Sequence, residues 1–169
     1  SDEIVNWAKD GGFICETDKE FKPEDPISRE KTASVLYLYA KAKGYDVLYV
    51  SPLKALINDQ TRRLQDMTAG LNVDVTPWHG DISASRKAKS LKNPSGILVI
   101  TPESLESFLI NRNSSVKTAF GKLKYVVIDE LHAFIGNERG KQLQSLLSRI
   151  ELITGVKAPR IAMSATFSN

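Results

Sequence analysis

Residues 125–132 read Tyr125-Val126-Val127-Ile128-Asp129-Glu130-Leu131-His132, an apolar run that ends in two adjacent acids. The run shows no alternation of polar and apolar residues, so both of its faces are expected to be buried. Strands of this kind occur in parallel sheets that helices cover on both sides. The segment therefore predicts a central strand over 125–128, with the two acids at its carboxyl end.

Four other short segments are candidate strands, and segments of helical period separate them; three of the five candidates are nearly continuous in apolar residues. Alternating strands and helices are typical of an α/β domain. We predict a parallel sheet flanked by helices in a three-layer arrangement. The expected strands are 47–50, 73–78, 97–100, 125–128 and 160–163, and the expected helices are 53–67, 83–91, 102–110 and 140–154.

The first 46 residues show no obvious strand and predict a helical hairpin, with helices over 4–9 and 26–43. Ser28 can cap the second helix, and Gly44 can end it. No flexible linker separates this hairpin from the first strand. We therefore divide the chain into an N-terminal helical hairpin, residues 1–46, and an α/β domain, residues 47–169.

Composition and charge restrict the partners that the chain can have. Apolar residues make up 41% and charged residues 25%, as in a globular protein, and no apolar run reaches the ~20 residues that a membrane-spanning helix needs. The single cysteine excludes a disulfide or a multi-cysteine zinc site within the chain. Residues 1–46 carry seven Lys/Arg and ten Asp/Glu, whereas residues 47–169 carry sixteen and ten. Only the second part suits a polyanionic partner.

Asp129 and Glu130 are candidate catalytic residues. At the end of a buried parallel strand, an aspartate can hold Mg²⁺ while the next acid polarises a water for attack on a terminal phosphate. Because adjacent strand residues point to opposite sides, the two acids can have separate roles. The alternative is a solvated acidic turn with His132 at the surface. For Ser164-Ala165-Thr166, the alternative is a polar strand exit with ordinary capping.

Five short segments occur in order, each at the carboxyl end of an expected strand, which is the edge where open α/β sheets bind ligands. Together they make residues 47–169 resemble the first RecA-like domain of a superfamily 2 DEAD/DEAH-box helicase, particularly of the large helicase-related type. The segments are Tyr49-Val50-Ser51-Pro52-Leu53-Lys54-Ala55-Leu56, Trp78-His79-Gly80-Asp81, Ile100-Thr101-Pro102-Glu103-Ser104-Leu105, Asp129-Glu130-Leu131-His132 and Ser164-Ala165-Thr166.

The resemblance implies roles for individual residues. Asp129, Glu130 and His132 match the DExH box, with Asp129 as the Mg²⁺ ligand, and Ser164 and Thr166 match the motif that couples hydrolysis to strand separation. The implied contacts to one strand of DNA or RNA, mainly to its phosphates, come from three turns: Pro52, Leu53 and Lys54; His79 and Gly80; Thr101, Pro102 and Glu103. Helix N-termini offer free N–H groups to phosphates, which gives such turns a physical reason to bind them. The basic cluster Arg86, Lys87, Lys89 and Lys92 either adds attraction for nucleic acid or forms a solvated helix face.

The family's phosphate-binding loop, which ends in Gly-Lys-Ser/Thr, does not occur in the sequence. Its nearest match is Lys31-Thr32, but Glu30 replaces the glycine, and a carboxylate there would repel phosphate. ATP and Mg²⁺ are the cofactors that the resemblance implies, with weak or no binding expected. A second motor domain is also missing, so the chain is not expected to unwind a duplex by itself.

Most of residues 1–46 resemble a surface-layer homology repeat, with Trp7 and Ile27-Ser28-Arg29-Glu30 at the ligand-facing motif. That resemblance implies a cell-wall polymer as a partner and a location at the cell surface. The helicase resemblance instead implies the cytoplasm. Two functions therefore remain open from the sequence: a helicase fragment and a noncatalytic wall-binding or scaffold protein.

Overall fold

The computed structural model describes residues 44–164. The expected helical hairpin, Lys31, Thr32 and Thr166 lie outside this range. Within it, five strands form one sheet, in the order β2-β3-β1-β4-β5, and every neighbouring pair is parallel. The strands are β1 (Val47–Val50), β2 (Val75–Trp78), β3 (Ile97–Ile100), β4 (Tyr125–Ile128) and β5 (Arg160–Ala162). The predicted parallel α/β sheet is confirmed.

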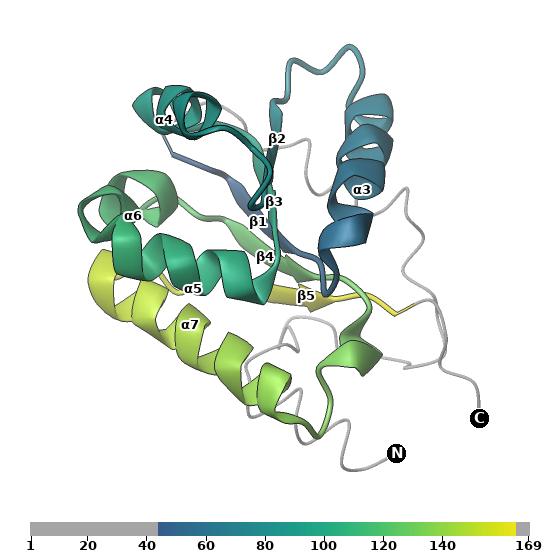
Figure 1. Cartoon of the computed structure of the whole chain (residues 1–169), viewed down its shortest axis with the longest axis vertical. Coiled ribbons are helices and arrows are strands. Elements are labelled where there is room, and N and C mark those ends of the chain that lie inside the picture. The colour runs from purple at the N-terminus through teal and green to yellow at the C-terminus, as the bar shows by residue number, and fades with distance from the viewer. Residues whose placement is uncertain (1–43, 165–169) are drawn as a thin grey trace.

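Helices connect the strands and cover both faces of the sheet, so the predicted three layers are also confirmed. Figure 1 shows α3 on one side and α4 to α7 on the other. The helices are α3 (Lys54–Met67), α4 (Ala84–Lys92), α5 (Pro102–Asn111), α6 (Asn113–Phe120) and α7 (Glu138–Thr154), with a short 3₁₀ helix, η1 (Leu131–Ala133).

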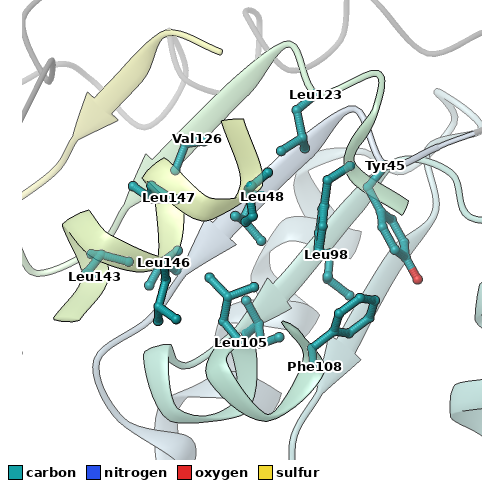
Figure 2. Close-up of a cluster of buried hydrophobic side chains, with 14 of the residues drawn as sticks. Tyr45, Leu48, Leu98, Leu105, Phe108, Leu123, Val126, Leu143, Leu146 and Leu147 are labelled. Atoms are coloured by element: carbon teal, nitrogen blue, oxygen red, sulfur yellow. The ribbon is translucent and has the colours of Figure 1, made fainter. Parts of the chain in front are cut away.

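Alternate strand residues enter two separate cores. Leu48, Leu98 and Val126 pack with helices α5, α6 and α7 in the larger core, as Figure 2 shows. Tyr49 and Val127 face the other way, in the smaller core that α3 covers with Ile57 and Leu64. This alternation explains why β1, β3 and β4 consist of apolar residues and tyrosine: both faces of these central strands are buried.

A hydrogen-bonded cluster fixes the starting edge of the sheet. The buried carboxylate of Asp46 accepts a hydrogen bond from the backbone N–H of Gly96 at 3.2 Å, and burial raises the pKa of Asp46. Gly96 has a φ of +68°, and a Cβ there would overlap the backbone carbonyl of Asp74. The next residue, Ile97, donates to that same carbonyl at 2.8 Å. Glycine at 96 therefore allows β3 to start directly beside β2.

The outer edge of β2 carries a proline. Because Ile97 donates to the Asp74 carbonyl, residues 74, 76 and 78 direct their backbone groups toward β3, and Pro77 faces outward. Proline has no N–H to offer, so it fits an edge position and would break a central ladder. The outer edge of β2 therefore lacks one backbone N–H with which a further strand could pair.

The predicted boundaries need small corrections, and one helix was missed. Strand β2 begins at residue 75, not 73, β5 ends at 162, and α7 begins at 138, not 140. Helix α6 was not predicted because its first turn, Asn113-Ser114-Ser115, has low helix propensity. Burial of Val116, Ala119 and Phe120 against the larger core stabilises this helix instead.

Candidate functional site

The carboxyl ends of the strands form one rim. Val50 is in register with Ile100 and Ile128, and Ile100 is in register with Trp78. The residues that follow these strand ends therefore share an edge of the sheet, although they are far apart in sequence. Of the four residues expected to gather on one rim, Lys54, Thr101 and Asp129 do so, and Thr166 lies outside the described residues.

Asp129 is held in place by hydrogen bonds to both of its carboxylate oxygens. Its side chain is buried, with 7% exposed. Gln60 of α3 donates from Nε2 to Oδ2 at 2.9 Å, and the backbone N–H of Glu130 donates to Oδ1 at 3.0 Å. The Asp129 N–H also donates to the Val50 carbonyl. The carboxylate has a fixed orientation before any ligand is bound.

Glu130 lies in a turn that the sequence did not reveal. Its backbone lies in the left-handed region, with φ 50° and ψ 54°, so the chain has already left the strand. Glu130 Oε2 lies 3.3 Å from His132 Nδ1, and His132 Nδ1 lies 3.2 Å from Ser164 Oγ. The two acids have separate partners because a turn, and not strand alternation, separates them; their separate catalytic roles stay a prediction.

The pair Lys54–Asp81 connects two of the turns on the rim. Lys54 begins α3, and its Nζ lies 2.8 Å from Asp81 Oδ1 in the β2–α4 loop, with 55% and 71% of the side chains exposed. The Lys54 ammonium lowers the pKa of Asp81. In the same loop, a Cβ at Gly80 would meet no atom within 4 Å, so open space lies beside that glycine. An anion approaching this loop would compete with Asp81 for Lys54.

His79 is buried and supports the β2–α4 loop from the interior of the protein. Its ring is 5% exposed, and Nε2 lies 3.2 Å from Asn58 Oδ1 of α3. Nδ1 is buried without a hydrogen bond. Burial lowers the pKa of His79, so the ring is neutral at pH 7. Direct contact of His79 with nucleic acid stays a prediction.

The third turn leads from β3 into α5. Thr101 caps α5, because its Oγ1 accepts a hydrogen bond from the Ser104 N–H at 3.2 Å, and Pro102 occupies the first helical position. Both residues are buried. Glu103 is exposed and accepts hydrogen bonds from Arg139. Capping therefore uses the Thr101 hydroxyl, and Glu103 is the charged group that this turn presents.

Helix α4 carries the basic cluster, and none of its residues is buried. Lys87 Nζ lies 5.6 Å from the ring centroid of the buried Trp78, and the Arg112 guanidinium lies 5.7 Å from the same ring. The remaining members, Arg86, Lys89 and Lys92, are exposed. One basic residue of the cluster therefore has a packing role.

A magnesium ion would find one fixed carboxylate at this rim, that of Asp129. Gln60 and the Glu130 N–H hold its two oxygens. Within residues 44–164, no group of three His, Cys, Asp or Glu side chains could hold a metal ion. Mg²⁺ usually takes most of its ligands from water and substrate phosphates, so a single carboxylate such as that of Asp129 suits it.

Sequence reasoning missed three residues that organise the rim: Asn58, Gln60 and Arg139. Asn58 and Gln60 flank the buried stripe of α3, where a polar residue can reach the sheet end. Arg139 lies in the first turn of α7, where a cation opposes the helix dipole. That unfavourable placement is the signal that could have identified it.

Comparisons with known proteins agree with this geometry. The model of the DEAD/DEAH box helicase family matches residues 31–169. The Lhr helicase/uracil glycosylase of Escherichia coli is 36% identical over 138 residues, which is 75% of this chain and 9% of that protein. ATP-dependent helicase Lhr-Core of Methanothermobacter thermautotrophicus is 35% identical over 130 residues, 70% of this chain and 15% of that protein. The chain thus spans a small part of these relatives.

Solved structures give the same result. Mycobacterium smegmatis helicase Lhr bound to ssDNA and AMP-PNP matches with a TM-score of 0.66 and 33% identity, over 75% of this chain and 18% of that chain. DUF1998 helicase MrfA bound to DNA matches with a TM-score of 0.64 and 29% identity, over 74% and 17%. These matches confirm the RecA-like fold that the sequence predicted.

The helicase family match starts at residue 31, inside the segment that resembles a surface-layer homology repeat. That resemblance stays a prediction for residues 1–46. Among the helices of residues 44–164, none is long and apolar enough to cross a membrane.

Proposed function

Because this chain belongs to the DEAD/DEAH box helicase family, we propose that its rim binds one strand of DNA or RNA as part of the first motor domain of an ATP-dependent helicase. The single observation that carries the proposal is the convergence of three turns and the Asp129–Glu130 pair on one edge of a parallel sheet. Relatives solved with ssDNA or DNA support the choice of ligand. A cytoplasmic location follows from this function.

The turns offer groups that suit phosphates. Helix α3 starts at Lys54 without a side-chain cap, since the Leu53 side chain has no acceptor atom, and the Leu56 N–H donates to the Leu53 carbonyl at 3.0 Å. The positive end of the helix dipole and a nearby ammonium attract an anion. Gly80 leaves room for a backbone to approach. Contacts of this kind are independent of base sequence, so we expect little sequence preference.

Nucleotide binding is the second part of the proposal. The family match begins at residue 31, which supports Lys31-Thr32 as the end of the phosphate-binding loop, but the glycines before it are missing. Those backbone N–H groups normally surround the phosphates. We therefore expect weak or no ATP binding by these 169 residues and no duplex unwinding. When bound, Mg²⁺ would neutralise phosphate charge next to Asp129, while Glu130 and His132 would orient a water.

Fluorescence anisotropy with labelled single-stranded DNA and RNA tests the nucleic-acid proposal. Binding should be measurable at about 50 mM salt and should fall steeply by about 200 mM, because phosphate contacts release counterions. A flat titration at low salt would contradict the proposal. Calorimetry with ATP and Mg²⁺ tests the cofactor, with Asp129→Asn as the matched control; tight ATP binding that Asp129→Asn leaves unchanged would remove Asp129 from the metal site.

Cell-wall binding by residues 1–46 is the alternative function from the sequence. A pull-down of the full chain on purified cell wall tests it directly. We expect no retention, because the family match and the rim geometry both support the nucleic-acid function.

A further inference from the structure

Arg139 connects two of the turns on the rim. Its Nη2 donates to the backbone carbonyl of Pro52 at 2.6 Å, in the β1–α3 turn. The same Nη2 donates to Glu103 Oε1 at 2.8 Å, and Nε donates to that oxygen at 3.1 Å, in the β3–α5 turn. One guanidinium therefore bridges segments that are 51 positions apart in the chain, from Pro52 to Glu103.

The position of Arg139 is electrostatically unfavourable for the helix that carries it. It is the second residue of α7, and a cation there opposes the positive end of the helix dipole. A lone surface arginine would gain nothing from this placement. The contacts to the two turns offset the unfavourable interaction with the helix dipole. We therefore attribute the position of the Arg139 side chain to these contacts.

Arg139 also lies at the end of the segment that leads from Asp129 and Glu130 through η1 to α7. Its guanidinium lies 5.4 Å from the ring centroid of Phe134, which is fully buried. Phe134 follows η1, and its N–H donates to the carbonyl of Leu131, directly after Glu130. The bridge is therefore anchored to the part of the chain that carries Asp129 and Glu130.

We infer that Arg139 is a positioning residue, which holds the β1–α3 and β3–α5 turns at a fixed spacing so that both can contact one nucleic-acid strand. The inference rests on the proposed function. Arg139 does not contact the strand itself in this role; it acts through Pro52 and Glu103. Glu103 is then kept on a phosphate-binding surface, despite its negative charge, because it anchors the bridge.

The role of Glu103 can be tested, because simple electrostatics and the positioning role predict opposite effects of Glu103→Ala on affinity. Simple electrostatics predicts that Glu103→Ala strengthens binding of a polyanion, because a negative charge is removed. The positioning role predicts weaker binding, because the bridge is broken. Arg139→Ala should weaken binding on the order of tenfold, and the double variant should bind no more weakly than Arg139→Ala alone.

Lys141→Ala is the matched control for lost charge. Lys141 lies two residues further along α7, its side chain is 73% exposed, and its Nζ pairs with Glu138 at 2.9 Å. It removes the same positive charge without touching either turn. Its effect on affinity should be within about twofold, since one distant exposed charge is well screened.

The experiment is fluorescence anisotropy of the full chain with labelled single-stranded DNA, accompanied by urea denaturation of every variant. If Arg139→Ala does not fold, Glu103→Ala still tests the inference, because its affinity for DNA either rises or falls. Tighter binding by Glu103→Ala, or equal affinities for Arg139→Ala and Lys141→Ala, would overturn the inference alone. Failure of the unmodified chain to bind would overturn the proposed function and the inference with it.

Discussion

Lys54→Ala is the most direct test of phosphate contact at the rim. Lys54 is the exposed cation at the start of α3, and Asp81 is its partner in the structure. A phosphate that replaces Asp81 would keep the ammonium paired and would release a counterion. Removing the ammonium should therefore weaken binding for every sequence of DNA or RNA by a similar factor.

The size of the effect follows from counterion release. Each phosphate neutralised on a single strand contributes a slope of about 0.7 in log affinity against log salt. Loss of one such contact should raise Kd about fivefold at about 0.1 M salt and about threefold at about 0.2 M. These factors are upper limits, because the phosphate must first displace Asp81 from Lys54.

The assay is anisotropy with labelled single strands across a salt series. Lys157→Ala is the control, because Lys157 is exposed in the loop between α7 and β5, at the edge of the sheet where the strands begin. Asp81→Ala should tighten binding by freeing Lys54. If the salt slope of Lys54→Ala equals that of the unmodified chain, Lys54 contacts no phosphate and the reasoning fails.

Three further predictions concern the fold that supports the rim. Because burial lowers the pKa of His79, the unfolded chain takes up more protons there than the folded chain, so stability should fall as pH drops from about 7.5 to about 5.5; His79→Gln should reduce this fall in urea denaturation, and an equal fall in both proteins would contradict it. Gly96→Ala should destabilise far more than Gly136→Ala, because both have φ +68° but only the first Cβ would overlap backbone; equal unfolding midpoints would contradict this. Phe108→Ala should lower the free energy of unfolding by about 3–5 kcal/mol, because the side chain is 2% exposed and lies between two aromatic rings at 5.0 and 5.1 Å; a loss under about 1 kcal/mol would show that this core repacks freely.

The sheet could be predicted from the sequence because its strands are buried on both faces. Continuous apolar runs such as Ile97–Ile100 admit few other structures when helical segments separate them. Parallel pairing then places all the strand ends on one edge, so the positions of Lys54, Thr101 and Asp129 followed without coordinates. Helix α6 could not be predicted, because burial against a distant part of the chain stabilises it.

Contacts between turns could not be predicted from local patterns. Gln60 reaches Asp129 across 69 residues, and Arg139 reaches Pro52 across 87. Neither pair has a sequence signature, since the partners of a side chain depend on how elements pack. The left-handed backbone of Glu130 could not be predicted either, because the sequence pattern gave no sign that the strand ends before the two acids.

The backbone at residue 130 and the side chain at residue 130 favour different amino acids. A φ of 50° suits glycine, and any residue with a Cβ is less stable there by roughly 1 kcal/mol. Only an acid supplies a carboxylate next to His132. Glutamate at this turn therefore lowers the stability of the fold and, in return, places a carboxylate beside His132.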